Sequence, residues 1–314
     1  MRHRPDISEA GALIALFAGA LALGTSGIFV RWSQTGPTAT AFWRGALALP
    51  VLALWAYLER RRSTHASLRD PMFLWAGVFF VGDLALWHTS LLLTSIAAST
   101  LEANCAPMLV TLVAWTLWGE RPRPGFLVAL GLAFAGVLLM LVPKLGAGSH
   151  ALLGDALGLG TACFYAAYFL VVARLRTRYG TGIVMLTSTA VFTLILLPLA
   201  LTQRFLPLTP HGWWLLAGCA ISAQVLGQSL IAYALAHLPA TFSAVGLFTQ
   251  VVAAAAYAWL LLGEQLLPVQ MLGGAVVLLA IGFALAARRT AALTEDQVPR
   301  ASLQPSMPRQ SESR

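Results

Sequence analysis

The amino-acid sequence predicts an all-α integral membrane protein with ten transmembrane helices in two inverted-topology repeats of five helices. Hydrophobic residues make up 58% of its 314 positions and charged residues 10%, whereas charged residues are roughly a quarter of a soluble domain. Apolar segments of about 20 residues recur along the chain, and each is long enough to cross a bilayer as a helix. The short alternating strands of an outer-membrane barrel are absent from the sequence. These observations favour a helical bundle in the membrane.

A repeated turn divides the chain into two similar halves. One apolar run ends at Gly119-Glu120 and the next restarts at Pro124, and the same plan returns at Gly263-Glu264 and Pro268. The two Gly-Glu pairs lie about 144 positions apart, which is close to half the chain. Because each predicted half holds five helices, an odd number, the second half enters the membrane upside down relative to the first.

The ten predicted helices follow the apolar runs in chain order. They span residues 11–32, 37–58, 71–93, 97–118, 124–142, 152–173, 181–201, 211–236, 240–262 and 268–288. The predicted organisation is an N-terminal segment (1–10), a first repeat (11–142), a linker (143–151), a second repeat (152–288) and a tail (289–314). The tail is rich in Ser, Pro, Gln and Arg and has nothing to bury, so it is expected to be disordered.

The positions of Lys and Arg predict the orientation of the bundle. One face carries the basic residues of the N-terminus, of three short connections and of the tail, whereas the opposite face carries Arg31, Lys144 and Arg204. Connections that are rich in Lys and Arg remain in the cytoplasm. Both termini are therefore predicted to be cytoplasmic, and the 143–151 linker periplasmic.

Other functional classes are disfavoured by the composition. The net charge of +8 does not indicate a nucleic-acid partner, because the basic residues are scattered through short loops. Cys105, Cys163 and Cys219 each lie alone in an apolar run, without the spacing of a metal site or a redox pair. No P-loop indicates ATP hydrolysis. No cofactor, metal site or catalytic residue is predicted, and the expected partners are a small-molecule substrate and the lipid bilayer.

Four ionisable residues fall inside the predicted helices of the first half: Arg44, Asp83, His88 and Glu102. An ionisable group at bilayer depth costs at least about 2.5 kcal/mol and usually faces a cavity or a partner. Arg44 is expected to pair with Glu102 or Asp83, or to attract a substrate carboxylate. A static ion pair between helices is the alternative, and His88 either titrates near neutral pH or donates a structural hydrogen bond. The four are assigned to charge tuning or to gating on the outer side.

Aromatic and uncharged polar residues form stripes at helical spacing. Trp87 shares a stripe with Asp83, and Tyr165 aligns with Tyr168. Such stripes suit a ligand with an apolar body and a small polar end, although the same rings also pack as ordinary core residues. The predicted substrate-binding residues are Trp87, Asn104, Tyr165, Tyr168, Gln224, Gln228 and Gln250. The rings would contact the side chain of the substrate, and the amides would bind its polar end.

These features resemble the EamA-like exporters of the drug/metabolite transporter superfamily. The resemblance is carried by the paired Gly-Glu turns, by Phe42-Trp43-Arg44 and by Ser99-Thr100-Leu101 with Pro107. The aromatic lining and Ala41-Phe42-Trp43-Arg44 look most like the YddG-type aromatic amino acid exporters. The resemblance covers residues 11–288 and implies a multi-pass carrier in the bacterial inner (plasma) membrane, with a cavity between its halves. Val251 stands where the second half would match Pro107, which leaves open whether both halves bend alike.

The leading hypothesis is a secondary transporter that exports small amphipathic metabolites, above all aromatic or hydrophobic amino acids, by rocking one repeat against the other. One alternative is a carrier of a polar or phosphorylated metabolite of the nucleotide-sugar type, which would need several basic groups in the membrane. An intramembrane enzyme would need convergent catalytic groups, whereas Asp83, His88 and Glu102 do not fall on one face of their helices. The chain is therefore expected not to be an enzyme.

Overall fold

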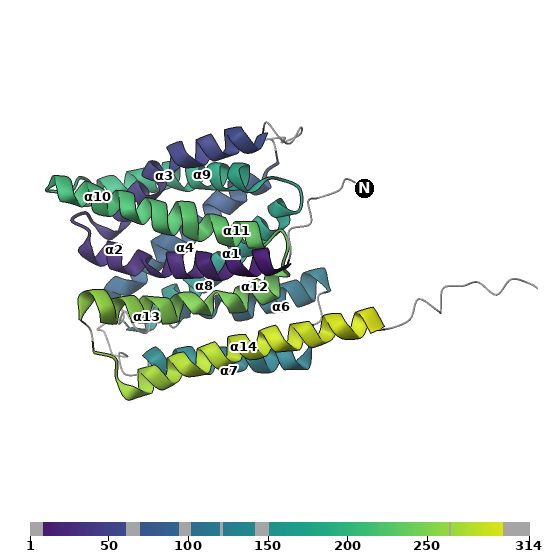
Figure 1. The fold of residues 1–314 in the computed structure, drawn as a ribbon. Coiled ribbons are helices and arrows are strands. Elements are labelled where there is room, and N and C mark those ends of the chain that lie inside the picture. The colour runs from purple at the N-terminus through teal and green to yellow at the C-terminus, as the bar shows by residue number, and fades with distance from the viewer. Residues whose placement is uncertain are drawn as a thin grey trace, which may run out of the picture.

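The computed structural model describes residues 9–60, 70–93, 102–119, 122–141, 151–263 and 265–297. All regular structure in these ranges is helical, and the long helices lie side by side with roughly parallel axes (Figure 1). Glu9 lies at one end of this bundle, on the right in Figure 1, and Trp32 lies at the opposite end. We call these the Glu9 end and the Trp32 end.

The helices occupy the ranges that the apolar runs predict, and several of them are divided into two or three pieces. The 94–101 segment, with Ser99-Thr100-Leu101, lies outside the described residues. The last helix continues beyond its predicted end, because the segment after residue 288 is rich in good helix formers such as Ala and Leu. In chain order the elements are α1 (Glu9–Gly24), α2 (Ser26–Trp32), α3 (Pro37–Arg60), α4 (Met72–Leu93), α6 (Ala106–Trp118), α7 (Pro124–Leu141), α8 (Ala151–Arg176), α9 (Thr181–Leu201), α10 (Pro210–Cys219), η2 (Ala220–Gln228), α11 (Ser229–Ala234), α12 (Ala240–Gly246), α13 (Phe248–Leu262) and α14 (Pro268–Gln297).

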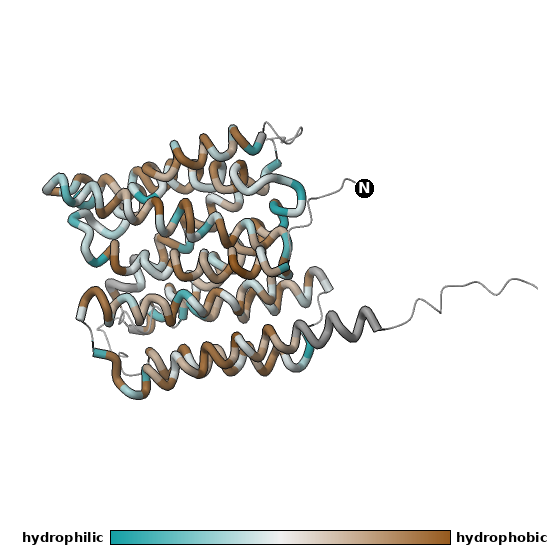
Figure 2. The backbone as a smooth tube through the Cα atoms, viewed as in Figure 1, coloured by the Kyte–Doolittle hydropathy of each residue, from teal (hydrophilic) through white to brown (hydrophobic). Residues whose placement is uncertain are grey.

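The surface of the bundle is that of a multi-pass membrane protein. Among the described residues, eight helical stretches are long and apolar enough to cross a membrane, and Met72–Trp87 and Ala106–Leu117 are shorter apolar helices. Hydrophobic residues run along the helices, and hydrophilic residues lie mostly toward their ends (Figure 2). Large apolar side chains are exposed on the outside, such as Leu279 at 74% and Leu194 at 69%. So much exposed apolar surface is stable in lipid and not in water.

The most extensive helix contacts join the two halves of the chain. α1 packs against η2, α11 and α13; α3 packs against α9 and η2; α4 packs against α8 and α9. α6 packs against α8 and α12, and α7 pairs with α14 along one edge of the bundle (Figure 1). Each of these contacts brings a helix that ends by Leu141 against one that begins at or after Ala151. The halves are therefore interlocked and do not form two separate bodies.

Two antiparallel helices, α3 and α9, complete each other's ends. Glu59, in the last turn of α3, accepts hydrogen bonds from the backbone N–H of Thr181 (2.9 Å) and of Gly182 (2.7 Å), at the start of α9. Gln203, just beyond α9, accepts one from the N–H of Thr38 (3.0 Å), at the start of α3. The first N–H groups of a helix have no partner within it. Each helix therefore caps the other in a reciprocal arrangement.

The glycines of the two predicted Gly-Glu turns have nearly the same φ angle. Gly119 follows α6 with φ of 70°, and Gly263 follows α13 with φ of 67°. This left-handed conformation ends a helix at low cost only when the residue is glycine. Glu120 and Glu264 lie outside the described residues.

Three of the predicted helices are interrupted, and a fourth contains a π-helical segment. α1 and α2 are separated at Thr25, a turn at Asn104 and Cys105 precedes α6, and Leu247 separates α12 from α13. The second and third breaks lie about 143 positions apart, at corresponding places of the two predicted repeats. The bend thus occurs in both halves, and Val251 shows that it needs no proline in the second. The π-helical segment is η2, a rare geometry that is frequent at functional sites.

Glycine lets the interrupted α1 lie directly against η2. A Cβ atom at Gly19 would lie 2.9 Å from the carbonyl oxygen of Gly227, closer than real Cβ contacts come. Near the break, the hydroxyl of Thr25 hydrogen-bonds the hydroxyl of Ser222 at 2.9 Å. Small residues at such crossings are typical of helix packing in lipid. The two irregular helices therefore meet backbone to backbone in the interior of the bundle.

Candidate functional site

Arg44 is a buried cation without a full set of partners. It lies on α3 and is 7% exposed. Its Nε donates a hydrogen bond to Gln224 Oε1 at 3.0 Å, its Nη1 reaches Ser26 Oγ at 3.5 Å, and its Cζ lies 5.7 Å from the centre of the Phe80 ring. Its Nη2 is buried without a hydrogen-bond partner. No carboxylate among the described residues comes within ion-pair distance of the guanidinium.

The interrupted and π-helical segments supply the partners of Arg44. Ser26 is the first residue of α2, directly after the break at Thr25. Gln224 lies on η2, is buried, and donates from Nε2 to the hydroxyl of Thr189 on α9 at 2.9 Å. Because a π-helix adds a residue to the turn, it changes the direction in which the following side chains project. Gln224 and Gln228, one turn apart, both belong to this segment and both are buried.

Asp83 and Tyr165 face the same place from the other side. Asp83 lies on α4 one turn after Phe80, and its carboxyl group lies near the guanidinium of Arg44. Its carboxyl group has no hydrogen-bond donor within the described part of the chain. Tyr165, on α8, lies near Gln228, Asp83 and Arg44, and its buried hydroxyl makes no hydrogen bond of normal geometry. Both side chains are half-buried although they face the interior.

We call this set the Arg44 cluster. It consists of Ser26, Arg44, Asp83, Tyr165, Thr189, Gln224 and Gln228. It combines one guanidinium, one carboxyl group, amides and hydroxyls, and it leaves the Arg44 Nη2 and the Tyr165 hydroxyl without partners. Buried polar groups are almost always hydrogen-bonded, so two unsatisfied groups in one cluster point to a site that a polar ligand completes.

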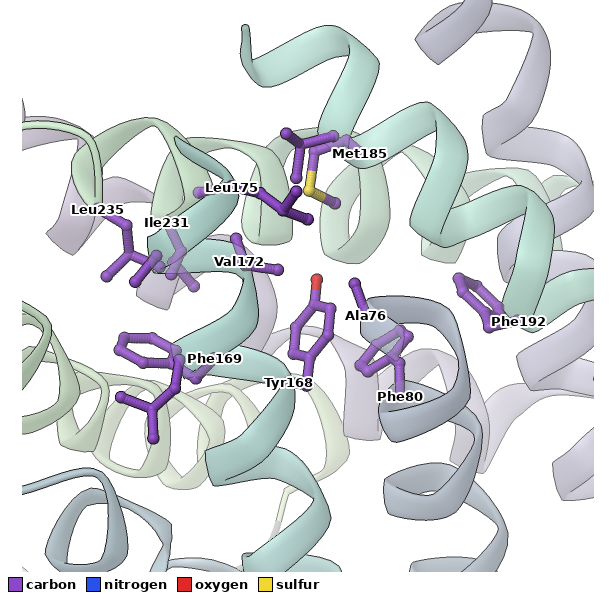
Figure 3. Close-up of a cluster of buried hydrophobic side chains, with 14 of the residues drawn as sticks. Ala76, Phe80, Tyr168, Phe169, Val172, Leu175, Met185, Phe192, Ile231 and Leu235 are labelled. Carbon is purple, nitrogen blue, oxygen red and sulfur yellow. The ribbon is translucent and has the colours of Figure 1, made fainter. Parts of the chain in front are cut away.

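Tyr168 lies beside the cluster and packs in the apolar core. It is 2% exposed, and its ring stacks on that of Phe80 with the centroids 4.6 Å apart (Figure 3). The ring of Phe80 also meets that of Phe192 edge to face at 5.0 Å. The ring of Tyr165 lies 6.2 Å from that of Tyr168. These aromatic rings form an apolar wall next to the polar groups of the cluster.

The other predicted substrate-binding residues are more widely spread. Trp87 is half-buried on α4, one turn beyond Asp83. Asn104 lies in the turn before α6, and Gln250 lies on α13, where its backbone carbonyl faces Gly24 of α1. The His88 side chain lies outside what the structure describes.

Glu102 is close to Asp155, which the sequence reasoning did not single out. A Cβ atom at Gly158 would lie 1.9 Å from Glu102 Oε2, so the absence of a side chain there makes room for the carboxyl group. The charges of Glu102 and Asp155 interact, and each group has one buried oxygen atom without a hydrogen-bond partner. Of the two carboxyl groups proposed for Arg44, the structure thus places Asp83 near it and Glu102 against α8.

Sequence reasoning also missed Ser26 and Thr189, which contact Arg44 and Gln224 respectively. Ser26 lies in the run Gly24-Thr25-Ser26-Gly27, where small polar residues interrupt an apolar helix. That run was a signal for the break. Thr189 is one of several hydroxyl residues on α9, and nothing in the pattern distinguishes it from its neighbours.

Aromatic rings gather around Trp43, the residue that precedes Arg44 in the chain. Trp43, the neighbour of Arg44, donates from its Nε1 to the carbonyl oxygen of Phe205 at 2.8 Å. Its ring lies 4.8 Å from that of Trp213 and 5.1 Å from that of Phe205. Phe42 also meets Phe205, at 5.2 Å. The Phe42-Trp43-Arg44 motif therefore places two rings in this aromatic group, whereas Arg44 contacts Gln224 and Phe80.

No group of three His, Cys, Asp or Glu residues lies close enough to hold a metal ion within the described residues. Cys105, Cys163 and Cys219 are free thiols. The chemistry available at the Arg44 cluster is therefore charge pairing and hydrogen bonding.

A multi-pass apolar bundle with an incompletely paired polar cluster in its interior is typical of membrane transporters. The chain belongs to the EamA-like transporter family, whose model matches residues 10–142 and again residues 152–286.

The chain is similar over most of its length to curated members of this class. It is 27% identical over 279 residues to the pseudopaline exporter CntI of Pseudomonas aeruginosa (strain UCBPP-PA14). The aligned region covers 88% of this chain and 95% of that exporter. It is 26% identical over 284 residues to the uncharacterized transporter YwfM of Bacillus subtilis (strain 168), covering 86% and 93%. A crystal structure of another protein matches it with a TM-score of 0.74 and 18% identity, over 90% of this chain and 99% of the other. That last similarity shows the fold alone.

Proposed function

We propose that this protein is a secondary transporter that exports small amphipathic metabolites, namely aromatic or hydrophobic amino acids, across the bacterial inner membrane by alternating access. The observation that carries the proposal is the Arg44 cluster, a set of partly unpaired polar groups beside aromatic rings inside an apolar bundle. An amino acid combines an apolar side chain with a charged polar end, and the cluster offers a complement to each. A relative named as an exporter supports the outward direction.

The proposed topology has ten membrane spans in two inverted repeats, residues 11–142 and 152–288, with both termini in the cytoplasm. The reciprocal caps support it, because Glu59 at the end of α3 caps the start of α9, and Gln203 after the end of α9 caps the start of α3. The left-handed Gly119 and Gly263 support it at a second pair of positions. An internal two-fold axis would make corresponding residues of the two repeats form the same contact. Glu59 and Gln203 both accept hydrogen bonds from the first N–H groups of the opposite helix.

The predicted residues take the following roles. Trp87, Tyr165 and Tyr168 contact the apolar part of the substrate, and Asn104, Gln224, Gln228 and Gln250 bind its polar end. Arg44, Asp83, His88 and Glu102 tune the charge of the site or gate its outer side.

The contacts favour moving units that combine helices from both repeats. One unit holds α1, η2, α11 and α13, and the other holds α4, α6 and α8. The Arg44 cluster lies between them, with Gln224 and Gln228 on the first unit and Asp83 and Tyr165 on the second. Arg44 comes from α3 and Thr189 from α9. These two helices pack on each other, and they contact the first unit through η2 and the second unit through α4. A rocking motion of these units would open the cluster to one side of the membrane at a time.

A transport assay tests the proposal. The purified full-length chain is reconstituted in liposomes, and uptake of labelled phenylalanine, threonine, a lipophilic cation and a nucleotide sugar is measured under imposed pH and voltage gradients. We expect phenylalanine to move faster than in protein-free liposomes, and the nucleotide sugar not to move. Failure to move any amino acid or the lipophilic cation contradicts the proposal, and movement of the nucleotide sugar favours a carrier of phosphorylated metabolites.

A further inference from the structure

We infer that the Arg44 cluster is a binding site for a zwitterionic head group, in which Arg44 holds a carboxylate and Asp83 holds an ammonium. This inference rests on the proposed function and specifies the part of the substrate that the site recognises. It assigns direct contacts to two residues that sequence reasoning had placed in charge tuning.

The guanidinium is arranged to receive a carboxylate. Its Nε and Nη1 are directed to Gln224 and Ser26, and both are neutral groups that hold the side chain in place without cancelling its charge. Its Nη2 is a hydrogen-bond donor without a partner, although the side chain is only 7% exposed. Arginine binds carboxylates through such forked donors. The Tyr165 hydroxyl, which lies beside Gln228, supplies a further hydrogen-bond donor in the same cluster.

The Asp83 carboxyl group is arranged to receive a cation. It accepts no hydrogen bond from the described residues and forms no ion pair with them within 4.0 Å, yet it lies near Arg44. Asp83 is half-buried, and its i−3 neighbour Phe80 carries the guanidinium on its ring face. A static ion pair would draw the two groups into contact. Their separation leaves both charges available to a third molecule.

Charge balance selects a zwitterion over an ion of either sign. When Asp83 is ionised, Arg44 and Asp83 together are neutral, and a ligand with one carboxylate and one ammonium keeps the occupied site neutral. A lone anion or a lone cation would leave one unit of net charge in a low-dielectric interior, which is unfavourable. The apolar wall formed by Tyr168 and Phe80 lies next to this pair, where the side chain of an amino acid would fit.

Competition on the unaltered protein provides the first test. Displacement of labelled L-phenylalanine from the detergent-purified full-length chain is measured with L-phenylalanine, phenylalaninamide, phenethylamine and 3-phenylpropionate. Phenylalaninamide and phenethylamine lack the carboxylate, and 3-phenylpropionate lacks the ammonium. We expect each of the three to compete at least ~10-fold more weakly than phenylalanine, a tenfold change corresponding to about 1.4 kcal/mol. This measurement does not depend on the folding of any variant.

Two substitutions then separate the charges. In Arg44→Gln the preference for phenylalanine over phenethylamine should disappear, and in Asp83→Asn the preference over 3-phenylpropionate should disappear. Each variant should keep the other preference. The matched controls are Arg31→Gln and Glu9→Gln, which remove a charge of the same sign outside the cluster and should leave all four affinities unchanged. Circular dichroism and elution volume check that the variants are folded.

The outcomes distinguish the two proposals. If phenylalanine is transported but the analogues compete as well as phenylalanine does, the head-group assignment is overturned and the proposed function stands. The same holds if both variants lose all preferences together. If no amino acid is bound or transported, both proposals are overturned.

Discussion

Gln224 is the residue that connects the cluster to the rest of the bundle. It joins Arg44 of α3 to Thr189 of α9 through two hydrogen bonds of about 3 Å. Its position on a π-helical turn directs both ends of its amide toward these partners. At this scale the fold and the proposed binding site depend on the same side chain.

Two substitutions at Gln224 should therefore have different effects. Gln224→Ala leaves the Arg44 Nε and the Thr189 hydroxyl unpaired in a buried place, which should lower the free energy of unfolding by roughly 1–3 kcal/mol. Gln224→Glu keeps an acceptor for Arg44 and adds a negative charge that competes with a substrate carboxylate. We expect its thermal stability to be retained while phenylalanine binding weakens at least ~10-fold. Thermal unfolding in detergent and ligand binding measure the two effects, and equal phenylalanine affinity in Gln224→Glu would contradict the role given to Arg44.

The pairing of Arg44 with Gln224 was not predictable from the sequence. Both residues were selected as buried polar groups, but they lie 180 positions apart. A helical wheel fixes the relative directions of side chains on one helix and not the rotation of one helix against another. The π-helical segment adds a further rotation, and its single glycine, Gly227, does not distinguish it from the ordinary helices of this chain, which also contain glycine. Single polar residues in apolar runs were thus found, whereas their partners required the packed structure.

At the scale of elements, the α7–α14 pair depends on a close glycine crossing. A Cβ atom at Gly136 would lie 2.7 Å from the carbonyl oxygen of Gly273 and 2.9 Å from the Val277 nitrogen, and these backbone atoms cannot move independently of α14. Nearby, Gln270 donates from Nε2 to the carbonyl oxygen of Met140 at 3.0 Å. The two helices are held together by backbone contact as well as by this hydrogen bond.

Gly136→Ala should therefore force α7 and α14 apart and lower the free energy of unfolding by about 1–3 kcal/mol, as overpacking does. Gly131 lies on the same helix and has no atom within 4 Å of the position that a Cβ would take. Gly131→Ala is the matched control, and it should be neutral or slightly stabilising because alanine is the better helix former. The melting temperatures of both variants in detergent check this expectation, and equal melting temperatures would contradict it.

The helices themselves were largely predictable, and their interruptions were not. Runs of about 20 apolar residues fixed where each helix lies, because length and composition suffice for that. The break at Leu247 has no proline near it, and the turn at Cys105 precedes Pro107 instead of falling on it. Such breaks depend on whether neighbouring helices satisfy the freed backbone groups, which is a property of the assembled bundle.

For the whole molecule, the proposed orientation makes opposite predictions for the two ends of the bundle. Leu208, 71% exposed near the Trp32 end, should face the periplasm, and Thr177, an exposed residue near the Glu9 end, should face the cytoplasm. Single cysteines are placed at these positions after Cys105, Cys163 and Cys219 are replaced. A membrane-impermeant thiol reagent should label position 208 in spheroplasts and position 177 only after the membrane is permeabilised. Labelling of both positions from the same side would contradict a membrane crossing by α9, and the reverse pattern would contradict the proposed orientation.

The interlocked contacts also govern how the chain is assembled during synthesis. α1 is made first, whereas α11 and α13, which cover its buried face, follow about 200 residues later. At a translation rate of roughly 5–20 residues per second, this delay is about 10–40 s. During that time the glycine-rich face of α1 is open to lipid or to the insertion machinery. A nascent chain that stops before α11 therefore leaves its first helix without the neighbours that hold it.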